Sequence, residues 1–78
     1  MIAAEVEISM FRQYPSSIEV VSQAPIEEWC LEFIGPKAEF RDQVSDEFPW
    51  TFTHGTRGLT VWHFAREESA TMFRLKWA

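Results

Sequence analysis

The chain contains a single cysteine, Cys30, so it cannot form a disulfide bond within itself. This excludes a disulfide-rich secreted scaffold and predicts a reducing, cytoplasmic location. The sequence also has no apolar run of the roughly 18 to 20 residues that a membrane-spanning helix needs. Its start, MIAAEVEISM, carries acids where a signal peptide has a basic region. We therefore expect no membrane segment and no leader.

Basic residues are also scarce: seven Lys and Arg stand against twelve Asp and Glu, which gives a formal net charge of −5. Residues 1–52 have a net charge of −7, whereas residues 53–78 have +2. Binding to a phosphate backbone depends largely on cations, so nucleic acid is disfavoured as a direct partner. The acidic balance favours a partner with a basic surface, although a charge of this size also keeps a small protein soluble.

Aromatic residues, in contrast, are abundant, with seven Phe, four Trp and one Tyr among 78 residues. A chain of this length is near the lower limit for folding without disulfides or metals, so its core must be dense. Each ring can bury roughly 150 to 250 Å² of surface. The composition therefore predicts one compact domain that spans residues 1–78.

The first segment, residues 2–11, alternates between apolar and polar side chains as a half-buried strand does. Its apolar positions are Ile2, Ala4, Val6, Ile8 and Met10, and its polar positions are Glu5, Glu7 and Ser9. The next residues, RQYPSS, have turn chemistry around Pro15. Residues 17–22 are rich in β-branched side chains, so they form either a second strand paired with the first or an extended approach to a helix.

The segment PIEEWCLEFIGP has the clearest helical pattern of the chain. Its apolar residues recur at the helical spacing of three and four positions, namely Ile26, Trp29, Cys30, Phe33 and Ile34. Pro25 suits the first turn of a helix, the acids after it suit a helix N-terminus, and Gly35 with Pro36 suits its end. Residues 37–49 that follow are polar with scattered apolar residues and predict either a loop or a helical turn.

Residues 50–53 and 59–64 alternate again and flank the turn sequence HGTRG, which predicts a β-hairpin. We expect Phe52 to pair with Val61, so that His54 lies opposite Leu59 and Trp50 lies opposite His63. Counting along the strands then directs Val61 and His63 toward the core.

The last stretch, residues 61–78, reads VWHFAREESATMFRLKWA and allows two interpretations. A single helix over 66–77 would leave Met72 and Leu75 away from its apolar stripe. A helix over 66–73 followed by a strand over 74–77 uses more of the apolar residues, and we prefer it. The expected fold is then α+β: a small two-layer sandwich with an antiparallel sheet and two helices, in a ferredoxin-like, split β-α-β arrangement.

Residue pairs that could carry metal or catalytic chemistry are not suitably spaced. Close ligand pairs such as C-x-x-C or H-x-x-x-H are absent from the sequence. The expected pairing separates His54 from His63 by roughly 13 Å, too far for one metal ion, and Cys30 belongs to the apolar helix face. The acids at the helix starts are explained by the helix dipole. We predict neither a cofactor nor an enzymatic activity.

Residues 57–70, RGLTVWHFAREESA, resemble the ribonucleoprotein strand motif of RNA-recognition-motif domains. The basic residue and glycine at the start and the aromatic at the eighth position, Phe64, carry this resemblance. It implies a β-α-β-β-α-β sandwich in which Trp62 and Phe64 face inward. In that family aromatics at the third and fifth positions stack RNA bases, but here these positions are Leu59 and Val61. An RNA-binding module is therefore a secondary alternative.

The ending of the chain, an acid pair followed by Ala70, Phe73 and RLKW, resembles the tails of small phage and marine-virus proteins. The resemblance implies a viral accessory protein that acts in a bacterial cytoplasm. Our leading hypothesis is a phage-encoded inhibitor that binds a basic surface of a host or defence factor, for example of the CRISPR type. The alternative is a structural protein that forms a homo-oligomer or part of a virion. The candidate partner-binding residues are Glu5, Glu7, Glu27, Glu28 and Glu32.

Overall fold

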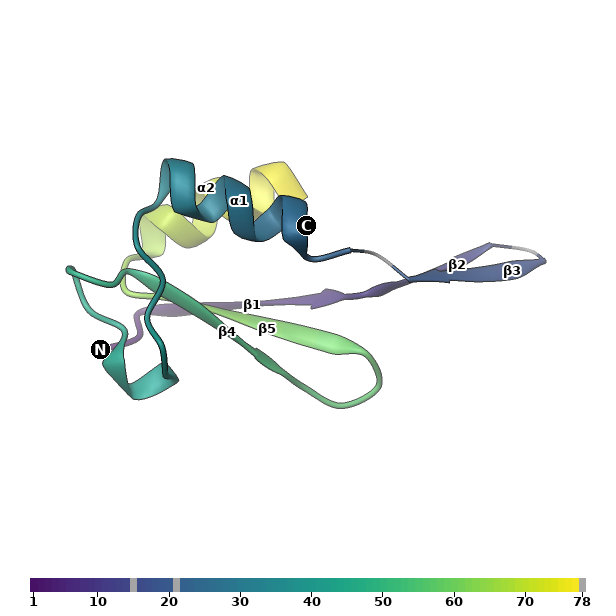
Figure 1. Cartoon of the computed structure of the whole chain (residues 1–78), viewed down its shortest axis with the longest axis horizontal. Helices are drawn as coiled ribbons and strands as arrows, with labels where there is room; N and C mark the ends of the chain where they lie inside the picture. Colours follow the sequence, from purple (N-terminus) through teal and green to yellow (C-terminus); the bar gives the residue numbers. More distant parts are fainter. Residues whose placement is uncertain (15, 21, 78) are drawn as a thin grey trace.

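The computed structural model describes residues 1–14, 16–20 and 22–77. Its elements in chain order are β1 (Ala4–Ser9), β2 (Phe11–Tyr14), β3 (Ser17–Val20), α1 (Ala24–Phe33), the 3-10 helix η1 (Arg41–Gln43), β4 (Trp50–His54), β5 (Leu59–Phe64) and α2 (Glu67–Trp77). One antiparallel sheet has the strand order β1-β5-β4, and both α-helices lie on the same face of it (Figure 1). The predicted α+β architecture with an antiparallel sheet and two helices is confirmed.

Strand β1 owes its position to the alternation of its side chains. Val6 is buried and Ala4 and Ile8 pack against the core, whereas Glu5 and Glu7 are exposed. After Met10 the chain continues into β2, which pairs with β3 as a separate hairpin that extends away from the sheet (Figure 1). Residues 17–20 form a strand, which is one of the two possibilities left open for 17–22, but this strand pairs with β2 and not with the first strand. Residues 12–14, expected to belong to the turn, are part of β2. Pro15 and Val21 lie outside the described residues.

Helix α1 forms where the apolar spacing predicts it. Pro25 lies in its first turn, and Ile26 and Cys30 are its buried residues. Gly35, directly after the helix, has a φ of 138°, which disfavours any residue with a side chain. Phe33 was expected to face the core, but its side chain is 56% exposed, and its ring centroid lies 5.4 Å from that of Trp29. The expected inward position of Phe33 is thus wrong.

The segment between α1 and β4 is a loop with one 3-10 turn, so it combines the two possibilities left open by the sequence. Its residues Ala38 and Val44 are buried. Figure 1 shows that the part around η1 lies beneath the sheet, on the side away from α1 and α2, and η1 contacts β4. This segment therefore covers part of the second face of the sheet.

The predicted β4–β5 register is wrong by one residue. Phe52 pairs with Trp62, Trp50 with Phe64, and His54 with Thr60. The connecting loop is longer by one residue than expected, because Arg57 and Gly58 both adopt left-handed conformations with φ of 57° and 73°. A shift of one residue exchanges the two faces of a strand. Trp62 and Phe64 therefore face the helices, as the RNA-recognition-motif resemblance implied.

The predicted closing strand at 74–77 is also wrong, because α2 continues from Glu67 to Trp77. Ala70 and Phe73 are buried, and Trp77 packs against the core one turn further on. Leu75 lies on the opposite side of the helix and is 86% exposed. The order of β1, α1, β4, β5 and α2 agrees with the first five elements of a split β-α-β sandwich. Since the described residues contain no sixth element, the ferredoxin-like arrangement stays a prediction.

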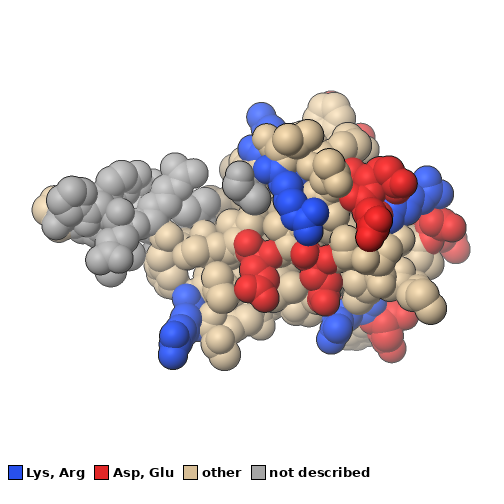
Figure 2. Space-filling model, turned by 180° about the vertical axis from the view of Figure 1, so that it is seen from behind, with Lys and Arg blue, Asp and Glu red and all other residues tan. Residues whose placement is uncertain are grey.

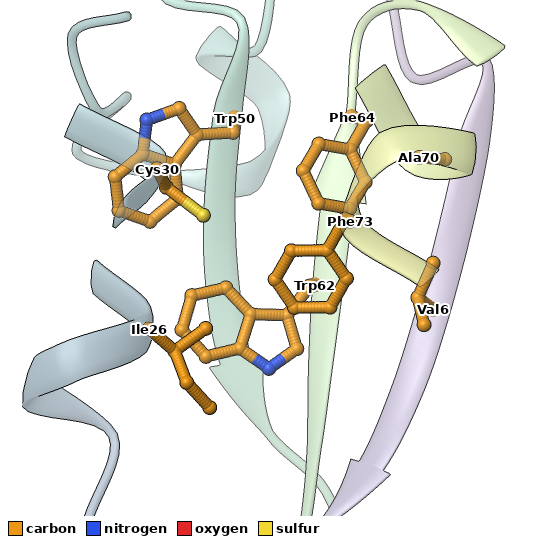
Figure 3. Packing of buried hydrophobic residues seen from close by; sticks show 8 residues of the cluster. All are labelled: Val6, Ile26, Cys30, Trp50, Trp62, Phe64, Ala70 and Phe73. Carbon is orange, nitrogen blue, oxygen red and sulfur yellow. The ribbon is translucent and has the colours of Figure 1, made fainter. Parts of the chain in front are cut away.

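The core lies between the sheet and the helices and is built mainly from aromatic rings (Figure 3). Its buried members are Val6, Ile26, Cys30, Trp50, Trp62, Phe64, Ala70 and Phe73. Trp62 is central, with ring centroids 5.9 Å from Trp50 and 5.2 Å from Phe73. The indole N–H of Trp50 donates to the Gly35 carbonyl at 2.7 Å, which ties β4 to the end of α1. No helix in the described part of the chain has the length and apolarity to cross a bilayer.

Candidate functional site

The structure divides the five acids predicted to bind a partner into two groups. Glu5 and Glu7 of β1 point to the face of the sheet away from the helices, because Val6 between them faces the core. Glu27, Glu28 and Glu32 belong to α1 in the helix layer. The five acids therefore do not form one continuous surface. Figure 2 shows acidic and basic side chains interspersed over one side of the molecule.

Among the residues that the structure describes, no strand pairs with the edge of β1 that faces away from β5, so we call it the free edge. Met10, which follows β1, donates its N–H to the Gly58 carbonyl at 2.9 Å. Because hydrogen-bonded pairs alternate along an antiparallel ladder, Val6 and Ile8 bond toward β5, while the backbones of Glu5 and Glu7 face outward. The carbonyl of Glu5 confirms this direction, since it accepts a hydrogen bond from Arg74 of α2 at 3.4 Å.

The opposite edge of the sheet, formed by β4, is covered by the chain itself. Lys37 forms a parallel bridge with Trp50, and the N–H of Ala38 donates to the Trp50 carbonyl at 2.8 Å. An uncovered strand edge presents unpaired N–H and C=O groups with which another chain can pair, so proteins often cover such edges or place charges beside them. In the described residues, the three-stranded sheet therefore has its β4 edge protected by a neighbouring backbone segment and its β1 edge open.

On the second face of the sheet, His63 of β5 links Glu5 to Thr53. The Nε2 atom of His63 lies 2.9 Å from the Thr53 hydroxyl, and its Nδ1 atom contacts a Glu5 carboxylate oxygen. The side chain of Glu5 is 41% exposed, and Arg41 of η1 approaches its carboxylate at 3.9 Å. His63 itself is only 2% exposed. This chain of three polar groups joins all three strands of the sheet across its second face.

The hydroxyl, imidazole and carboxylate follow the order of a nucleophile, a base and an orienting acid. Nε2 of His63 is hydrogen-bonded to Thr53, and Nδ1 lies against the Glu5 carboxylate, so the buried ring is held from both sides within the protein. Next to Thr53 lies a shallow depression of about 550 Å³, lined by Met1, Ile2, Phe40, Arg41, Asp42 and Thr53. We interpret the linked side chains of Thr53, His63 and Glu5 as a structural network that orders this face of the sheet and fixes the position of the Glu5 side chain.

The sequence did not reveal this contact, because the shifted hairpin register directed His63 to the core. In the observed register Glu5 lies directly opposite His63 across the β1–β5 pair. An acid next to a histidine on the polar face of paired strands is a recognisable signal once the register is known.

Cys30 is unsuited to nucleophilic chemistry. It is completely buried on the core side of α1. Desolvation, together with the nearby carboxylate of Glu27, raises the pKa of its thiol from 9.0 to about 12. Since the thiolate is the reactive form, the thiol is inert at neutral pH. The interpretation of Cys30 as a small core residue agrees with this position.

Several large apolar side chains are exposed on the outer sides of the helices and in the loop before β4. These are Leu31, Phe33, Phe40, Phe48, Met72 and Leu75. In β5, Leu59 and Val61 lie on the sheet face away from the helices, where the RNA-recognition family carries stacking aromatics. Most of the exposed large apolar side chains are thus on the helices and the loop, with Met1 and Phe11 elsewhere, and the base-stacking positions carry no ring.

Comparison of the chain with models of protein families, with curated proteins and with solved structures found no match.

Proposed function

We propose that the chain is a small accessory protein that works by binding another protein through the acidic, open side of β1. In this proposal it is a phage-encoded inhibitor of a host or defence factor, and it blocks a basic surface of that factor. The single observation that carries the proposal is the free β1 edge with Glu5 and Glu7 beside it. Opposite charges across an interface steer association and set specificity.

Glu7 is the better probe of this surface. Glu5 is engaged with His63, so its replacement would also disturb the second face of the sheet. Glu7 is exposed and lies opposite Val61, so its carboxylate is available to a partner. Reversal of its charge therefore changes the surface with little effect on folding.

The experiment compares two single charge reversals that alter the net charge equally, Glu7→Lys on β1 and Glu28→Lys on α1. Each variant and the unmodified chain are immobilised, exposed to bacterial host lysate at low salt, and the retained proteins are identified and their affinities measured. We expect a basic partner that Glu7→Lys loses and Glu28→Lys keeps. Loss with Glu28→Lys alone would move the interface to α1. Equal retention by all three chains would contradict binding through either acidic group.

A homo-oligomer is the second candidate, and the exposed apolar side chains of the helices favour it. Leu75 is 86% exposed and Phe33 is 56% exposed, so each helix presents a large apolar side chain to the exterior. In an assembly these residues would be covered by a second copy. Light scattering over a wide range of concentration tests this. A mass that stays at that of one chain, 9.2 kDa, would contradict it.

A further inference from the structure

We propose that the partner adds a strand to the free edge of β1, antiparallel to it, with Lys or Arg opposite Glu5 and Glu7. This inference rests on the proposed function and specifies how the partner binds. It turns the three-stranded sheet β1-β5-β4 into a four-stranded one. The new strand occupies the position beside β1 where a split β-α-β sandwich has its closing strand.

The backbone of β1 presents the donors and acceptors that such a strand needs. Strand β1 has six residues, Ala4–Ser9, which is the usual length of a strand in a sheet. Glu5 and Glu7 direct their N–H and C=O groups outward, while their neighbours bond to β5. An added strand satisfies these groups with main-chain hydrogen bonds. Contacts with every second side chain of the added strand then determine which partner binds.

The side chains next to this edge select a basic strand. Residues directly opposite each other in an antiparallel pair have Cβ atoms about 5 Å apart, so a cation opposite Glu5 or Glu7 forms a cross-strand ion pair. The two acids are two positions apart and share one face. The complementary strand therefore carries basic residues at alternate positions.

The same acids disfavour pairing with a second copy of the chain. Antiparallel pairing of β1 with another β1 brings Glu5 and Glu7 of the two copies close to each other. Like charges at such positions destabilise the pair. Acidic side chains thus act against self-association of this edge and in favour of a basic partner strand.

Arg74 of α2 occupies one acceptor of the edge in the free chain. Its guanidinium donates to the Glu5 carbonyl at 3.4 Å, and its side chain is exposed. An added strand replaces this long contact with a main-chain N–H. Replacement of Arg74 should therefore strengthen binding of the added strand more than replacement of Lys76. Lys76 is a base on the same helix, and its amine lies over the Trp77 ring.

The test uses a defined probe, the peptide acetyl-Lys-Val-Lys-Val-Lys-Val-amide, and nuclear magnetic resonance of the intact chain. We expect the amides of Glu5 and Glu7 to exchange roughly tenfold more slowly with solvent when the peptide saturates the chain. A control peptide carries the same charges but has a methyl group on each Lys backbone nitrogen, the donors that face β1. It should not protect these amides.

Charge and edge variants complete the experiment. Glu7→Lys should weaken binding of the peptide about tenfold, whereas Glu28→Lys, with the same change in net charge, should change it by about twofold or less. Arg74→Ala should bind the peptide more tightly than Lys76→Ala, and equal affinities would contradict the replacement of the Arg74 contact.

The outcomes separate this inference from the proposed function. If both peptides bind equally near Glu7, the acidic surface stands and strand addition is overturned. If the peptide instead slows exchange of the amides around Glu27, Glu28 and Glu32, the β1 edge is not the binding site and α1 is. If neither peptide binds, the strand inference is wrong, and the affinities of partners from host lysate still decide the proposed function. Slow exchange of the Glu5 and Glu7 amides without any peptide, together with a doubled mass, would identify a second copy as the added strand.

Discussion

The imidazole of His63 in β5 lies 2.9 Å from the hydroxyl of Thr53 in β4, on the sheet face that the helices leave uncovered. On its other side the ring contacts Glu5 of β1. The contact with Glu5 means that one acid beside the free edge is held in place by the sheet. The carboxylate of Glu7, two residues further along β1, is exposed and is available to a partner.

The Thr53–His63 hydrogen bond should contribute to stability. Thr53→Val preserves the shape of the side chain and removes the hydroxyl, so we expect the free energy of unfolding to fall by about 1 kcal/mol. In a His63→Leu background the same substitution should cost little, because the imidazole is gone. Urea denaturation of the two single variants and the double variant measures this. An equal loss in both backgrounds would show that the hydroxyl acts independently of His63.

Trp50 and Trp62 offer a matched pair of substitutions in the core. Both are completely buried and their rings are stacked, but only Trp50 donates its indole N–H, to the Gly35 carbonyl at 2.7 Å. In the described structure the indole nitrogen of Trp62 has no hydrogen-bond partner. Both Trp→Phe variants lose ring volume, and Trp50→Phe also leaves the Gly35 carbonyl unsatisfied. We expect it to destabilise the fold by about 1 kcal/mol more than Trp62→Phe.

Thermal unfolding of the two variants compares these losses directly. The hydrogen bond would be unimportant if Trp62→Phe were as destabilising as Trp50→Phe. The comparison is meaningful because the two substitutions remove the same atoms from neighbouring sites in one core.

Gly58 in the β4–β5 loop should resist substitution. Its φ is 73°, and a Cβ atom there would lie 1.9 Å from Cε2 of Phe11. Gly58→Ala should therefore lower stability by about 1 to 2 kcal/mol, with part of the loss relieved if the Phe11 ring moves. Gly55→Ala is the control, since its Cβ would meet no atom closer than 3.5 Å. Chemical denaturation should show a clearly smaller loss for Gly55→Ala, and similar losses would refute the role of Phe11 and the left-handed backbone.

The sequence predicts those features of the fold that depend on local side-chain pattern. The period of two in residues 4–9 identifies β1, and the spacing of Ile26 and Cys30 identifies α1, because each pattern places apolar side chains on one face. The fold class follows from the order of these elements. Such patterns are local and do not depend on the conformation of distant loops.

Two features depend on information that the pattern does not contain. The observed hairpin register differs from the expected one because Arg57 adopts a left-handed conformation, which is uncommon for a residue with a side chain, and the loop is one residue longer. The tail is helical because Phe73 and Trp77 both reach the core from one helix, at the cost of leaving Leu75 exposed. The candidate site depends on both: the register brings His63 to Glu5, and the helical tail leaves the β1 edge open.

The buried thiol of Cys30 should make stability depend on pH in alkaline solution. Burial and Glu27 raise the pKa of Cys30 in the folded chain from 9.0 to about 12. Above pH 9 the unfolded chain releases this proton while the folded chain retains it, so the unfolded state binds fewer protons. The free energy of unfolding should therefore fall by roughly 1 kcal/mol per pH unit from about pH 9 until the folded thiol also ionises.

Cys30→Ala removes this thiol and serves as the reference, because the other groups that titrate in the same range are common to both chains. Denaturation at pH 7 to 11 should show the stability difference between the two chains as constant up to about pH 9 and steadily smaller above it. A difference that stays constant over the whole range would mean that the thiol ionises equally easily in the folded chain. That result would contradict the desolvation of Cys30 by the packed core, since the charged thiolate would then have access to water.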